Sequence, residues 1–124
     1  MNPLIESTIN IIAEGTRIEG KVTFENISRV HGVLIGEVHT QKNSTLVIAE
    51  SAWVEGNIHA DVLIVDGYVR GDILASQKVL ISKTGRVIGN ILAPTFIMEF
   101  GAYFEGHCRM QKLQTTEDPS TPLA

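Results

Sequence analysis

The sequence lacks several features that mark common functional classes. A single cysteine, Cys108, excludes an internal disulfide and favours a reducing compartment. No run of 18 apolar residues occurs, so no segment is predicted to span a membrane. The N-terminus has neither a basic start nor a long apolar stretch, so no secretory signal is expected. Together these absences predict a cytoplasmic protein.

Basic residues are also scarce. The 124 residues include ten Lys and Arg against 14 Asp and Glu, which gives a formal charge of −4. Binding to phosphates requires cations that cluster on one face, whereas here they are scattered along the whole chain. Nucleic acid is therefore not an expected partner.

What the sequence does contain is an internal repeat. The pattern apolar-x-Gly-x-apolar occurs six times, and successive copies are 16, 20, 15, 18 and 17 residues apart. The repeated glycines are Gly20, Gly36, Gly56, Gly71, Gly89 and Gly106. β-Branched residues dominate and no segment shows a helical spacing of apolar residues, so each copy is predicted to form three short strands joined at tight corners.

Stacking of the copies predicts columns of like side chains inside a solenoid. The column that follows the glycine is Val22, Val38, Ile58, Ile73, Ile91 and Cys108. In this column Cys108 is interpreted as a small buried hydrophobe rather than a reactive thiol. A second set of apolar pairs precedes most copies and is predicted to follow the same register: Ile9 and Ile11, Leu46 and Ile48, Val62 and Ile64, Val79 and Ile81, Phe96 and Met98.

These patterns predict an all-β protein, a parallel β-helix of about six coils with ~17 residues each. The β-helix is expected over residues 9–110 as the only domain. Residues 1–8 stand outside the repeat as an N-terminal tail, and the polar, proline-containing residues 111–124 are expected to be disordered.

The repeat resembles that of the bactofilins, bacterial cytoskeletal proteins. The resemblance lies in Gly71-Asp72-Ile73-Leu74-Ala75 followed by Gly85-Arg86-Val87-Ile88-Gly89-Asn90-Ile91, and in the opening segment 11–20. It implies a right-handed β-helix of triangular section that forms nucleotide-independent, non-polar filaments. It also implies a scaffold for cell-shape or cell-wall machinery, held peripherally at the inner face of the cytoplasmic membrane by a short N-terminal segment. The coils at 26–42 and 43–61 differ in length, which predicts a shifted corner between Asn43 and Thr45.

Two enzyme classes share a β-helical fold, and both are disfavoured. An acyltransferase on a left-handed β-helix needs an apolar residue every six positions, but Val87 and Ile91 are four apart. A carbonic anhydrase of the γ class would need three histidines on zinc. Of the candidates, His39 and His59 are expected to stack on adjacent coils but to face solvent, and neither His31 nor His107 is in register with them. We therefore expect no enzyme activity, no metal and no cofactor.

The predicted interaction residues lie on the surface and at the ends. An end coil normally needs a polar cap, because it exposes core side chains and unpaired strand edges. Here the last coil is rich in aromatic residues, which predicts a polymer interface between copies of the chain; the alternatives are a cap formed by residues 111–124 and a β-helical scaffold that stays monomeric or dimeric. The predicted interface residues are Phe96, Phe100, Tyr103 and Phe104; Leu4 and Ile5 are candidates for membrane contact, and Leu74 and Leu92 for contact with a lateral neighbour or membrane.

Overall fold

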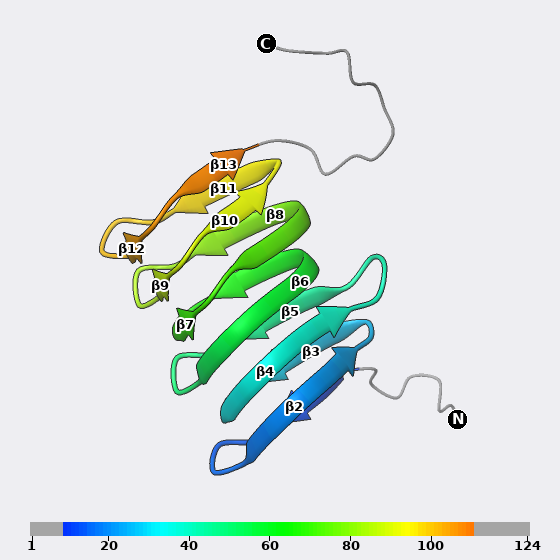
Figure 1. The fold of residues 1–124 in the computed structure, drawn as a ribbon. Helices are drawn as coiled ribbons and strands as arrows, with labels where there is room; N and C mark the ends of the chain where they lie inside the picture. Colours follow the sequence, from blue (N-terminus) through cyan, green and yellow to red (C-terminus); the bar gives the residue numbers. More distant parts are fainter. Residues whose placement is uncertain (1–8, 111–124) are drawn as a thin grey trace.

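The computed structural model describes residues 9–110 and, within that range, contains strands and no helix. The strands wind into a rod in which every turn lies against the next, and β2 (Arg17–Phe24) and β13 (Cys108–Met110) lie at opposite ends (Figure 1). All strand pairs are parallel. The predicted parallel β-solenoid of about six turns is confirmed. The predicted tails, residues 1–8 and 111–124, lie outside the described residues.

Each turn contributes strand segments to three faces of the rod. The first face contains the residues before each repeat glycine, and the second face contains those after it. Strands β2 and β4 run through both faces, and β6 continues onto the third. The strands of these two faces are β2 (Arg17–Phe24), β4 (Val33–Thr40), β6 (Trp53–Val65), β7 (Tyr68–Arg70), β8 (Ile73–Ile81), β9 (Arg86–Ile88), β10 (Ile91–Ala93), β12 (Tyr103–Glu105) and β13 (Cys108–Met110).

The third face closes each turn. It is built from the last residues of β6 and β8 together with four short strands. These are β1 (Ile9–Ile12), β3 (Ile27–Val30), β5 (Thr45–Ile48) and β11 (Thr95–Met98). Hydrogen bonds therefore connect each turn to its neighbours on all three faces.

The repeat glycines stack directly upon one another. All six have a positive φ, from +127° at Gly20 to +148° at Gly89. A Cβ added at Gly71 would lie 1.8 Å from the carbonyl oxygen of Gly56, and the four other glycines stacked on a preceding turn are equally crowded. Both the φ and this close approach of backbones require glycine, which explains why it recurs in every copy.

The corners next to the third face account for the unequal spacing of the repeats. The corner before that face is a single residue, Asp61, in one turn and four residues, 41–44, in another. Asn43 has φ +60° in the longer corner, a conformation that asparagine tolerates better than most residues. The longer corner confirms the predicted shift near Asn43.

The core confirms the predicted column after the glycine. Val22, Val38, Ile58, Ile73, Ile91 and Cys108 are in register from turn to turn. Its inner members are at most 2% exposed. Complete burial of each such side chain contributes about 1.5–3 kcal/mol relative to exposure.

The predicted apolar pairs are correct in three turns and wrong in two. Leu46 pairs in register with Leu63 rather than with Val62, and Ile48 pairs with Val65. Leu63 and Val65 are fully buried, so Val62 and Ile64 point outward. At the first turn Ile9 and Ile11 also point outward, and Ile11 is 61% exposed. The four apolar residues 62–65 carry no alternation from which the inward positions could be chosen.

Candidate assembly interfaces at the ends of the solenoid

The two terminal turns differ from the inner ones in having only one neighbour. Among the described residues, β1 and β2 at one end pair only with β3 and β4. At the other end β11, β12 and β13 pair only with β8, β9 and β10. Each end therefore presents backbone N–H and C=O groups that have no strand partner in residues 9–110, the usual template for pairing with another chain.

The N-terminal end exposes the start of the core. Ile18 and Val22 belong to columns that are fully buried further along, yet both are only half-buried. Beside them, the inward Asn10 side chain donates hydrogen bonds to the carbonyl oxygen of Glu25 (2.8 Å) and to Ser28 Oγ (3.3 Å). This end is thus apolar around Ile18 and Val22 and polar at Asn10. No residue of this end was among the predicted interface residues.

The C-terminal end exposes aromatic rings. Phe104 is in register with Val87 and hence with the column of Val69 and Val54, as its position in the repeat predicts. It packs against the core but stays half-buried, with its ring centroid 5.5 Å from that of Phe96. Cys108 is also half-buried here, and burial raises the pKa of its thiol. The surface of this end is therefore apolar.

The other two predicted interface residues lie beside the end rather than on it. Phe100 occupies the corner 99–102 and is 96% exposed. Tyr103 faces outward, and its hydroxyl donates a hydrogen bond to Glu105 Oε1 at 2.6 Å. That hydrogen bond raises the pKa of Tyr103. Of the four predicted residues, the structure brings together Phe96 and Phe104, while Phe100 and Tyr103 flank them.

The structure describes the candidate lateral residues but not the candidate membrane residues. Leu74 and Leu92 are in register on the second face, half-buried, and line a pocket of about 300 Å³ with His107 and Arg109. Leu4 and Ile5 lie outside the described residues. Within residues 9–110 the structure has no helix of the length and hydropathy needed to cross a bilayer.

The histidines stack as predicted but form no metal site. His39 and His59 are in register, with ring centroids 4.6 Å apart. His39 Nε2 lies 3.4 Å from Glu37 Oε1. In the described part of the chain, no three His, Cys, Asp or Glu side chains are placed to hold a metal ion together.

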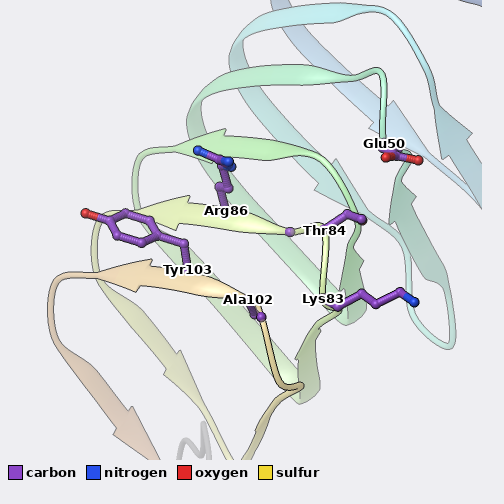
Figure 2. Close-up of a pocket in the computed structure, with 8 residues that line it drawn as sticks. Glu50, Lys83, Thr84, Arg86, Ala102 and Tyr103 are labelled. Carbon is purple, nitrogen blue, oxygen red and sulfur yellow. The ribbon is translucent and has the colours of Figure 1, made fainter.

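A larger pocket lies between two corners near the C-terminal end. It has a volume of about 560 Å³, and Glu50, Lys83, Arg86 and Tyr103 are among its lining residues. Figure 2 shows that the Arg86 and Tyr103 side chains lie on one side, whereas Lys83 and Glu50 extend on the other. Because these charged groups diverge, the pocket offers no convergent set of groups for a reaction.

Comparisons of the sequence with known proteins identify a family. A model of the bactofilin family, described as polymer-forming cytoskeletal, matches residues 10–109. Bactofilin BacP of Myxococcus xanthus (strain DK1622) is 30% identical over 110 residues, which are 89% of this chain and 45% of BacP. Bactofilin BacO of the same organism is 29% identical over 100 residues, which are 81% of this chain and 78% of BacO. No solved structure matches the chain.

The chain belongs to the bactofilin family of polymer-forming cytoskeletal proteins. The match covers less than half the length of BacP. Membership confirms the resemblance seen in the glycine repeat.

Proposed function

We propose that this chain polymerises end to end into non-polar filaments without nucleotide or metal. The observation that supports this is the pair of terminal turns, which have half-buried core side chains and, within residues 9–110, strands that pair with another strand on one side only. A second copy stacked on either end pairs those edges and completes the core, in the manner of β-augmentation. The alternative cap, residues 111–124, lies outside the described residues.

A non-polar filament joins like ends. Two C-terminal ends meet about a two-fold axis, so that Phe104 of one copy lies near Phe104 of the next. Two N-terminal ends meet in the same way around Ile18 and Val22. The rod has two different ends, and such a filament therefore alternates two kinds of junction.

Each junction needs both its apolar contact and its strand pairing to offset the free-energy cost of association. Covering a large apolar side chain contributes at most about 1.5–3 kcal/mol, whereas association costs about 4–15 kcal/mol in lost freedom. Phe96 and Phe104 are already partly covered, so their rings alone do not offset that cost. Pairing of the strand edges, together with preorganised backbones, supplies the remainder.

The filament acts in the cytoplasm as a peripheral scaffold for cell-shape or cell-wall machinery at the inner membrane face. Leu4 and Ile5 are the proposed membrane contacts; each contributes too little to hold one subunit, but a filament presents many tails together. Leu74 and Leu92 are a proposed contact for a neighbour or membrane, since both lie outward on adjacent turns.

Electron microscopy of the purified protein tests the assembly. We expect long filaments in buffer with chelator and without nucleotide, and no change when ATP, GTP or magnesium is added. Filaments that dissolve reversibly on removal of nucleotide or metal contradict the proposal. A protein that stays monomeric or dimeric under all conditions supports the alternative of a non-polymerising scaffold.

A further inference from the structure

The third face carries apolar side chains on its outer surface as well as its inner one. Two outward columns run along it, and eight of their 12 positions are apolar. The apolar members are Ile9, Ile11, Ile27, Val47, Val62, Ile64, Leu80 and Ile97. The others are Arg29, Thr45, Lys78 and Thr95. No carboxylate occupies an outward position of this face within residues 9–110.

The second face differs from the third in its outward composition. Among its outward residues in the described range 9–110, only Leu74 and Leu92 are apolar, and they lie among charged and polar residues such as Asp72 and Arg109. On the third face, Ile11, Ile27 and Ile97 are 61%, 46% and 44% exposed, respectively. A contiguous apolar surface of this kind marks a contact site.

We propose that the third face pairs with the third face of a second copy of this chain in a neighbouring filament, so that filaments associate laterally. The outer surface of a β-sheet can pack against another sheet about 10 Å away. The inference rests on the proposed polymerisation.

The distribution of charge favours a second copy over an anionic membrane. The corners that border this face carry six carboxylates, against the two lysines Lys42 and Lys83. These carboxylates are Glu14, Glu25, Glu50, Asp61, Asp66 and Glu99. A lipid surface of negative charge would be repelled by them. A second copy instead brings its own carboxylate-lined edges toward Arg29 and Lys78, which lie among the apolar residues.

The area of the face explains why pairing must depend on polymerisation. Four residues per strand and six turns cover about 13 by 29 Å, so one face buries about 380 Å² and a pair about 750 Å². That is below the roughly 1,200 Å² of a stable interface between two single proteins. A filament presents the face once per subunit, and many weak contacts in series hold two filaments together.

Electron microscopy of variants, together with sedimentation at low speed, tests the inference. Leu80→Lys and Ile64→Lys place a charge at half-buried outward positions without touching the core, and circular dichroism checks that each variant folds. Ile88→Lys is the matched control, because Ile88 is an outward, half-buried residue on the first face of the same turn as Leu80. We expect paired filaments in the wild type and Ile88→Lys, and loss of pairing with filaments retained in Leu80→Lys and Ile64→Lys.

The remaining outcomes separate the two proposals. If filaments of Leu80→Lys and Ile64→Lys pair as the wild type does, the lateral contact is wrong and polymerisation is unaffected. The same holds if wild-type filaments stay single. Absence of filaments in every sample overturns the proposed function and this inference together. Wild-type filaments that stay single but bind vesicles of anionic lipid, with binding lost in Leu80→Lys, identify the face as a lipid contact and overturn the inference.

Discussion

The inner and terminal turns of this solenoid have the same residue pattern but differ in burial. Val54 and Val69 are fully buried, whereas Ile18 and Phe104, in the same column at the two ends, are half-buried. The difference arises because an inner turn is covered on both sides and a terminal turn on one. A solenoid repeat thus completes its core only through its neighbour, and at the ends that neighbour has to be another molecule or a cap.

The stacked glycines also differ between the inner and the terminal turns. A Cβ added at Gly71 meets the backbone of Gly56, but one added at Gly20 has no atom within 4 Å. Both residues have a positive φ, +147° and +127°. The two positions therefore share the cost of backbone conformation and differ only in the presence of a preceding turn.

The largest expected effect comes from alanine at these two glycines. In a Phe104→Arg background, which keeps the protein unpolymerised, Gly20→Ala should lower the free energy of unfolding by about 1–3 kcal/mol, the cost of a side chain at positive φ. Gly71→Ala should lower it by more or prevent folding, because turns must separate to admit the Cβ. Urea denaturation measures both, and equal losses contradict the stacking of the glycines.

A smaller difference is expected for isoleucines truncated at an inner and a terminal position. Ile73→Ala removes a fully buried side chain and should cost about 2–5 kcal/mol. Ile18→Ala, at the half-buried N-terminal end, should cost less than half as much in the unpolymerised background. Thermal and urea unfolding, at a concentration where the protein is monomeric, check the pair, and a full-sized loss at Ile18 would then show that this end is covered within one molecule.

The smallest expected effect on stability is that of deleting residues 1–8. Because this segment precedes the repeat, its removal should leave polymerisation unchanged and reduce co-sedimentation of filaments with liposomes. A milder variant, Leu4→Ser with Ile5→Ser, should reproduce the loss if these two side chains make the contact. Liposome binding equal to that of the intact chain counts against the proposed anchor.

The sequence was sufficient to predict the solenoid because one residue type recurs for one physical reason. Glycine marks where backbones approach, and from it the columns of Val22 and Phe104 follow by counting. The orientation of the third face could not be predicted in the same way. In Val62-Leu63-Ile64-Val65 every position is apolar, so period-two alternation gives no sign of which residues point inward. The outward apolar columns, and the lateral contact proposed from them, can be identified only from the strand register in the structure.

The position of Phe104 at the C-terminal end was predictable, whereas the positions of its neighbours were less so. Phe104 has a place in a column, whereas Phe100 falls in a corner whose conformation the repeat does not determine. Residues of the N-terminal end were not predicted, because Ile18 and Val22 have the same sequence pattern as any other core positions. Only their half-burial distinguishes them.

The most direct test of the account is the substitution Phe104→Arg, followed by light scattering and circular dichroism. The arginine places a charge at the centre of the proposed junction, where desolvation costs several kcal/mol, while disturbing only the last turn. His107→Arg is the control, since it adds the same side chain in the same turn at an exposed outward position. We expect a folded monomer or dimer with an intact β spectrum for Phe104→Arg and filaments for His107→Arg. Long filaments of Phe104→Arg would show that the end-to-end interface is wrong.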